Sequence, residues 1–163
     1  MPENSQTIPE TLYPTDSGLV IYDGLCVLCS SAVRFLLRID KKKVLHFTSI
    51  KKTFASDHHN PEKRKSTQPE SILYIENQKL YSGSEAIIMI LIRIGSIWKS
   101  ARLLRVIPLG FREFLYRIIA KNRYTIFGKK TTCDIPDEKH AARFLPEIDP
   151  DELVLLTKST ALN

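Results

Sequence analysis

Short apolar runs and one longer segment of helical period make up the first fifty residues. Residues 19–22 are rich in β-forming side chains and end at the turn pair Asp23 and Gly24, which predicts a strand. From Leu28 to Ile39 apolar residues recur at helical spacing, which predicts a mostly buried helix. Its expected buried positions are Leu28, Ala32, Phe35, Leu36 and Ile39, and its expected solvent-facing stripe is Ser30, Arg34 and Arg38.

Three later runs also have strand character. They cover residues 44–50, 69–75 and 79–81. A polar connection over residues 51–68 separates the first from the second, and a turn at residues 76–78 joins the second to the third. The second and third runs are therefore predicted to form a hairpin.

An apolar helix follows the hairpin. Ser82 and Glu85 match an S-x-x-E capping box, so we predict a helix over residues 83–94 that ends at Gly95. Sequential strands that flank a helix pair in parallel, and the hairpin adds an antiparallel pair. The order of elements thus predicts an α/β fold, with a thioredoxin-like core over residues 18–97 in which helices flank a mixed four-stranded sheet.

A C-terminal helical extension, residues 98–145, is expected to pack on this core. Two amphipathic helices are predicted at residues 98–106 and 111–121, with Pro108 and Gly110 between them. Asp134 can cap a last helix that tolerates Pro136 in its first turn. Residues 1–17 and 146–163 are predicted to be tails, the first of them flexible.

The charge of the chain is concentrated in this extension. The chain of 163 residues carries a net charge of +6, and between positions 99 and 130 nine basic residues face one acidic residue, Glu113. The basic residues are Lys99, Arg102, Arg105, Arg112, Arg117, Lys121, Arg123, Lys129 and Lys130. Such a segment can attract an acidic partner, a nucleic acid or an anionic membrane surface, although a solvated helix face is the simpler interpretation. No nucleic-acid motif accompanies it, so no nucleic-acid partner is expected.

The N-terminal residues, the longest apolar run and the number of cysteines indicate the cellular compartment of the protein. Residues 1–18 are polar and lack a basic start followed by an apolar run, so we expect no secretory signal and a cytoplasmic location. The apolar run at residues 86–92 is too short for a membrane span. Three cysteines are an odd number, and the cytosol keeps thiols reduced, so catalysis or metal binding is more plausible than a structural disulfide.

Cys26 and Cys29 lie where a strand gives way to a helix, the setting of redox C-x-x-C pairs. Cys26 should lie at the helix N-terminus, where unpaired N–H groups and the helix dipole stabilise a thiolate, so it is the expected nucleophile. Cys29, one turn further along, is expected to keep its proton longer and to close the disulfide.

Three neighbouring residues are candidates for supporting roles. Asp23 can act as the turn residue before Gly24, or it can exchange a proton with Cys29. A proline that opens a strand beside a dithiol often has a cis peptide bond that shapes the substrate groove, so Pro69, together with Gly24, is a groove candidate. An ordinary proline at the first position of a strand is the alternative.

Metal binding is the main competing chemistry. A zinc ribbon needs a second ligand pair at matching spacing, whereas Cys133 stands alone more than a hundred residues downstream. His58 and His59 could complete a site with the cysteines, but adjacent side chains do not normally converge, and exposed loop residues are the simpler interpretation. We therefore predict no metal, and because no G-x-G-x-x-G fingerprint occurs, no bound cofactor either.

Two motifs resemble one family. The stretch "YDGLCVLC" resembles the D-x-x-C-x-x-C signature of the DCC family, and "NRYTIFGKKTTCDIP" and "ARFL" continue the likeness to about residue 145. The resemblance implies a thioredoxin-like core and thiol-disulfide oxidoreductase activity. By position, it puts the redox pair on Cys26 and Cys29, the signature acid on Asp23 and the C-terminal cysteine on Cys133. Cys133 can be a small buried residue, a third redox thiol or a ligand.

We therefore expect an enzyme that exchanges its dithiol with a disulfide in a protein or small-molecule substrate and that an external reductant regenerates. The alternative is a non-catalytic redox-sensing or binding module that docks an acidic partner through Arg102, Arg105 and Arg112. The sequence does not predict the substrate, the direction of electron flow or the oligomeric state.

Overall fold

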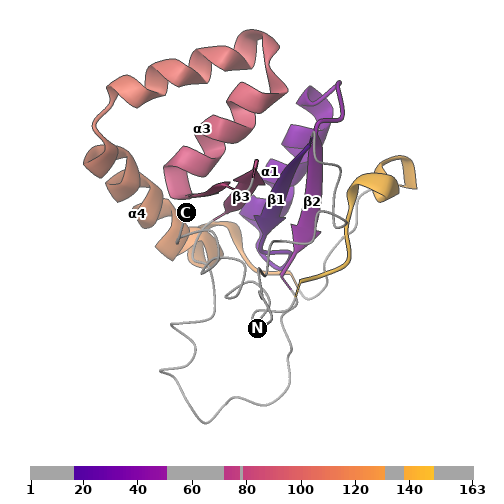
Figure 1. Cartoon of the computed structure of the whole chain (residues 1–163). Helices are drawn as coiled ribbons and strands as arrows, with labels where there is room; N and C mark the ends of the chain where they lie inside the picture. Colours follow the sequence, from indigo (N-terminus) through magenta and orange to yellow (C-terminus); the bar gives the residue numbers. More distant parts are fainter. Residues whose placement is uncertain (1–16, 51–71, 78, 131–137, 149–163) are drawn as a thin grey trace, which may run out of the picture.

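The computed structural model describes residues 17–50, 72–77, 79–130 and 138–148, and its centre is a four-stranded sheet (Figure 1). The strands follow the order β2-β1-β3-β4 across the sheet. Their bounds are Gly18–Tyr22 for β1, Leu45–Ser49 for β2, Leu73–Glu76 for β3 and Lys79–Ser82 for β4. Each described strand lies within two residues of its predicted bounds, except at the start of β3. That strand begins at Leu73, whereas the predicted start, Pro69, lies outside the described residues.

Strand β1 has one parallel and one antiparallel neighbour. It runs parallel to β2, to which helix α1 (Val27–Ile39) connects it, and antiparallel to β3. Strand β3 pairs with β4 as an antiparallel hairpin. This is the predicted mixed sheet of a thioredoxin-like α/β core. Its parallel β-α-β unit, β1-α1-β2, and its hairpin, β3-β4, are joined by the antiparallel pairing of β1 with β3.

Strand β1 is buried on both faces, and two clusters of apolar side chains lie on either side of it. Val20 and Tyr22 belong to the larger cluster, between the sheet and the helices α1 and α3 (Gly83–Ile94), whereas Leu19 and Ile21 belong to the smaller one. Alternate residues of a strand point to opposite faces, so a run of four apolar residues can serve both clusters. The strand therefore holds the N-terminus of α1 in a fixed place.

The buried face of α1 differs from the prediction. Phe35 is 47% exposed and touches the ring of Trp98 edge-on, with ring centroids 5.5 Å apart. Ser30, which was predicted to face solvent, is buried and its hydroxyl donates to the Gly24 carbonyl at 3.3 Å. The helix is thus rotated relative to the simple apolar stripe, because a local hydrogen bond satisfies the inward-facing serine.

Helix α3 has the predicted bounds but not the predicted cap. It ends at Gly95, whose φ of 78° suits glycine. The side chain of Ser82 makes no capping hydrogen bond. Instead, a carboxylate oxygen of Glu113 accepts a hydrogen bond from the Ser84 N–H at 3.0 Å. The capping-box prediction is therefore wrong, since a distant carboxylate satisfies the helix start.

The extension consists of η1 (Ser96–Val106), a 3-10 helix, and α4 (Leu109–Phe127), which is longer than predicted. Helix α4 follows Pro108 and ends at Gly128, where φ is 83°. It contacts α3 and α1, and Figure 1 shows it beside α3 at one edge of the molecule. No helix in the described ranges is long and apolar enough to cross a membrane.

The last described residues run along the edge strand β2. After the short 3-10 helix η2 (Glu138–Arg143), the Leu145 N–H donates to the Phe47 carbonyl at 2.8 Å and the Ile148 N–H donates to the Ser49 carbonyl at 3.1 Å. Ile148 is 3% exposed and completes the smaller apolar cluster, although the sequence placed it in a tail. The predicted cap at Asp134 lies outside the described residues.

Candidate active site

The two cysteines of the C-x-x-C pair lie at the start of α1, directly after the turn that follows β1. Cys26 is the N-cap residue, with φ −82° and ψ 120°, and its Sγ accepts a hydrogen bond from the Cys29 N–H at 3.3 Å. No disulfide joins them. The backbone N–H that a serine or aspartate side chain would cap is thus directed at the sulfur atom of Cys26.

The two thiols differ in their electrostatics. Burial, a hydrogen bond to Cys26 and the charge of Cys26 raise the pKa of Cys29 to about 12, and Asp23 acts in the same direction. The guanidinium of Arg123 opposes this rise. Cys29 is therefore protonated and hydrogen-bonded to Cys26. The assignment of an attacking and a resolving thiol stays a prediction.

Access to the two thiols also differs. Cys26 is fully buried, whereas Cys29 is half-buried. The chain that leaves α4 lies against the turn, because Lys129 forms an isolated antiparallel bridge with Cys26 and the Lys130 N–H donates to the Leu25 carbonyl at 2.8 Å. A disulfide substrate can reach the Cys26 sulfur only after groups around it move.

Asp23 combines a turn role with an ion pair. Its Oδ1 accepts from the Leu25 N–H at 3.1 Å, as a turn residue does. Its Oδ2 accepts from Nη2 of Arg123 at 3.2 Å and from the hydroxyl of Tyr124. The two side chains of the ion pair are only 4% and 8% exposed. The carboxylate is thus held by α4 next to the dithiol turn.

Helix α4 supplies residues that the sequence did not single out for the site. The Tyr116 hydroxyl accepts from the Ile72 N–H at 3.0 Å, and burial together with the nearby charges of Cys29 and Glu113 raises the pKa of Tyr116. Burial acts against the charge of Arg123, but Cys29, Tyr124 and Asp23 outweigh it and raise the pKa of Arg123. Arg123 directly precedes Tyr124 in the second sequence motif, and this position in the motif was the only sign in the sequence that Arg123 belongs to the site.

Several candidates from the sequence lie outside the described residues. These are Pro69 with its preceding peptide bond, Cys133, His58 and His59. Within the described ranges, no group of three or more histidine, cysteine, aspartate or glutamate side chains could hold a metal ion. A role for Cys133, as a third thiol or as a ligand, therefore stays a prediction.

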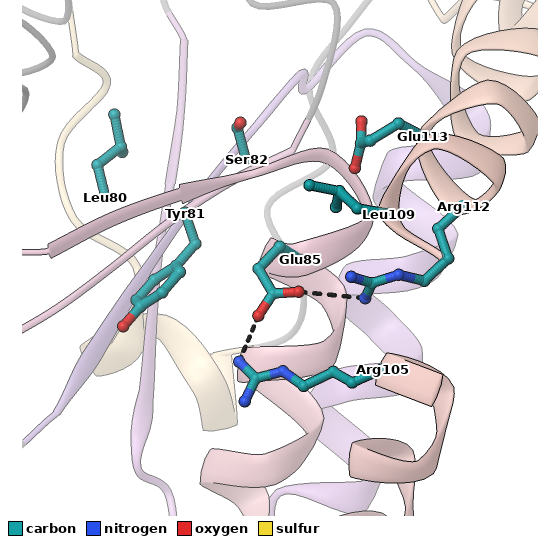
Figure 2. Close-up of a pocket in the computed structure, with 8 residues that line it drawn as sticks. All are labelled: Leu80, Tyr81, Ser82, Glu85, Arg105, Leu109, Arg112 and Glu113. Atoms are coloured by element: carbon teal, nitrogen blue, oxygen red, sulfur yellow. Dashed lines mark hydrogen bonds and ion pairs between the residues drawn. The ribbon is translucent and has the colours of Figure 1, made fainter. Parts of the chain in front are cut away.

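A pocket of about 550 Å³ lies beside α4, away from the cysteines (Figure 2). Its lining residues are Leu80, Tyr81, Ser82, Glu85, Arg105, Leu109, Arg112 and Glu113. Figure 2 shows Glu85 between Arg105 and Arg112, and it forms an ion pair with each of them. Burial opposes the charge of Glu85, but the two guanidinium groups lower its pKa. Of the three arginines assigned to an acidic partner, two are therefore already engaged.

Comparisons with known proteins agree with the geometry of the turn. The sequence model of the DCC1-like thiol-disulfide oxidoreductase family matches residues 20–129. The uncharacterized protein YuxK of Bacillus subtilis is 31% identical over 128 residues, which cover 78% of this chain and 93% of the relative. A chloroplastic DCC family protein of Arabidopsis thaliana is 29% identical over 118 residues, 72% of this chain and 69% of the relative. No solved structure gives a significant match.

Proposed function

The chain belongs to the DCC1-like thiol-disulfide oxidoreductase family, and we propose that it is an enzyme that exchanges its Cys26–Cys29 dithiol with a substrate disulfide. The observation that carries the proposal is the hydrogen bonding of the pair. The sulfur of Cys26 accepts from the Cys29 N–H, while burial and Cys26 keep Cys29 protonated, with a pKa of about 12. In this proposal Cys26 is therefore the attacking thiol and Cys29 the resolving thiol.

The reaction proceeds in two exchanges. The Cys26 thiolate attacks one sulfur of the substrate disulfide, the substrate S–S bond breaks, and the leaving thiolate takes up a proton. Cys29 then loses its proton and attacks Cys26 in the mixed disulfide, which releases the second substrate thiol. Two electrons pass from the dithiol to the substrate, and an external dithiol reductant restores the pair.

Arg123 and Asp23 assist the second exchange. Cys29 must become a thiolate to attack, and Arg123 is the neighbour whose charge lowers the pKa of Cys29. The ion pair with Asp23 holds that guanidinium in place, and Tyr124 shares the same carboxylate. We therefore assign Asp23 a positioning role through Arg123, in addition to its role in the turn.

Substrate binding must also expose Cys26. The bridge between Cys26 and Lys129 and the hydrogen bond from Lys130 to Leu25 are the contacts to release. They follow Gly128, which ends α4 with a φ of 83° and can change its backbone angles at low cost. Displacement of these two lysines would open the turn and leave α4 in place.

Replacing each cysteine tests the proposal. With insulin as the disulfide substrate and dithiothreitol as the reductant, Cys26→Ser should lose turnover, and Cys29→Ser should accumulate a mixed disulfide that mass spectrometry detects. Ser31→Ala, an exposed change on the same helix, is the matched control and should keep the rate of the unaltered chain. Equal turnover in all four proteins would refute the proposal. A mixed disulfide in Cys26→Ser and not in Cys29→Ser would reverse the two roles.

A further inference from the structure

Helix α4 turns its polar side towards the rest of the protein and its apolar side outward. Its inward side carries Glu113, Tyr116 and Arg123, which bind α3, the chain before β3 and the active-site turn. A surface helix of a globular protein normally turns its apolar side to the core and its polar side to water. The polar inward side of α4 leaves its apolar residues on the opposite side.

The outer face of α4 is defined by Phe111, Phe114, Leu115 and Ile118. These residues follow the spacing i, i+3, i+4 and i+7, so they form one stripe along the helix. Their exposed fractions lie between 44% and 59%. Single exposed apolar residues are common on protein surfaces, whereas an ordered stripe that includes two phenylalanines marks an interaction site.

The preceding 3-10 helix η1 shows the same feature. Ile97, Leu103 and Val106 are 71–82% exposed, and Ala101 is the single buried residue among its eleven positions. Both elements of the extension therefore present large apolar side chains to the outside. Packing of the described chain leaves these side chains uncovered.

The exposed charges on η1 and α4 are positive. Lys99, Arg102, Arg117 and Lys121 are exposed and form no ion pair with any described residue. The single acidic residue of the segment, Glu113, is turned inward to Ser84. The exposed parts of η1 and α4 thus combine apolar groups with cations that no described acidic residue pairs. This combination is typical of helices that lie in the interface of an anionic membrane.

We propose that the outward side of η1 and α4 docks on the surface of an anionic lipid bilayer. The apolar stripe would enter the boundary between headgroups and acyl chains, while the lysines and arginines bind the headgroup charges. The described helices are not suited to cross a membrane, so the chain lies on the surface. This proposal is independent of the disulfide exchange and holds whether or not the dithiol turns over.

Charge and shape favour this occupant over others. A second copy placed face to face would bring two sets of the same positive charges into one interface, and like charges close together cost free energy. The pocket beside α4 is lined by Leu109, Arg112 and Glu113, which lie on the side of the helix opposite Phe114 and Ile118. The outer face is thus a projecting helix surface, which a fluid bilayer accepts without a complementary groove.

Binding of the full chain to lipid vesicles tests the proposal. Vesicles of phosphatidylglycerol with phosphatidylcholine should sediment with the protein, and vesicles of phosphatidylcholine alone should bind it at least about tenfold more weakly. Raising the salt from about 0.05 M to about 0.5 M should release the protein, because it shortens the screening length.

Two pairs of variants locate the docking surface. Phe111→Ser with Phe114→Ser should weaken binding at least about tenfold, whereas leucine at both positions should preserve it. Arg117→Glu with Lys121→Glu should abolish binding, and Lys41→Glu with Lys42→Glu, exposed lysines after α1, should leave the apparent affinity within about threefold.

The remaining outcomes overturn the proposal. If the unaltered chain does not bind the anionic vesicles at low salt, or if the two charge-reversal pairs behave alike, the surface is not a lipid site. A chain that forms dimers in sedimentation equilibrium, and becomes monomeric with the two serines, docks on a second copy instead. A large fall in melting temperature caused by the two serines would mean that the chain itself covers the stripe.

Discussion

At the residue scale, Asp23 joins the dithiol turn to a helix that lies one hundred positions away in the sequence. Its two carboxylate oxygens serve different purposes, one in the turn with Leu25 and one in the ion pair with Arg123. The two interpretations of Asp23 that the sequence left open therefore concern different oxygens of one side chain. The charge of Arg123 in turn lowers the pKa of Cys29, which burial raises.

Breaking this ion pair should be costly because both side chains are buried. Arg123→Gln should lower the free energy of unfolding by about 3 kcal/mol, since it leaves a buried carboxylate without its cation. Arg117→Gln, an exposed change on the same helix, should leave it unchanged within error. Urea denaturation measures both.

The double variant separates this effect from general damage to α4. Asp23→Asn combined with Arg123→Gln should cost less than the sum of the two single changes, because the neutral pair leaves no unpaired charge. Strict additivity, or an Arg123→Gln protein as stable as Arg117→Gln, would contradict the assignment.

At the scale of elements, α3 and α4 depend on each other at the start of α3. Glu113 of α4 accepts from the Ser84 N–H, and the backbone of Gly83 lies so close that an added Cβ would stand 2.7 Å from the Glu113 carboxylate. Gly83 also has a φ of 61°, which disfavours other residues. The S-x-x-E pattern predicted a local cap, but tertiary packing supplies the acceptor instead.

The source of the cap can be tested with a matched pair of alanines. Glu113→Ala should lower the free energy of unfolding by about 1–2 kcal/mol, the usual value of a helix cap. Ser82→Ala should change it by less than about 0.5 kcal/mol, because that hydroxyl caps nothing. Thermal or urea denaturation followed by circular dichroism gives both values. A larger loss for Ser82→Ala than for Glu113→Ala would restore the local capping box.

At the scale of the whole molecule, the C-terminal strip beside β2 completes the core. Arg143 binds the buried carboxylate of Asp40 and donates from Nε to the Leu45 carbonyl at 2.9 Å. Ile148 then packs among the apolar residues on the second face of the sheet. The helices α1 and α3 cover one face, and this strip contributes to the other.

Removing the side chain of Ile148 should therefore destabilise the whole fold. Ile148→Ala should lower the free energy of unfolding by about 2–4 kcal/mol, the cost of a cavity in a packed core. Ile126→Ala, at a position 64% exposed, is the control and should have little effect. Similar stabilities of the two variants would show that residues 146–148 belong to a tail, as the sequence predicted.

The fold was more predictable than the site for a physical reason. Strand and helix positions follow from periodicity within a few residues, so the sheet and α3 were identified correctly from apolar runs such as β1 and the stop at Gly95. The rotation of α1 was not, because a buried serine can satisfy its hydroxyl locally, as Ser30 does. Arg123 of α4 binds Asp23 beside the dithiol turn. The two residues lie one hundred positions apart in the chain, so local spacing does not show that they meet.

The sequence by itself determined the α/β class, the strand-turn-helix setting of Cys26 and Cys29, and the family, because each of these rests on residues close together in the chain. Only the tertiary structure decided which side of α4 faces the dithiol, that a distant carboxylate caps α3, and that Cys26 is buried and bridged to Lys129, just after Gly128. Such contacts join segments many positions apart. Local spacing carries no information on which of these segments meet.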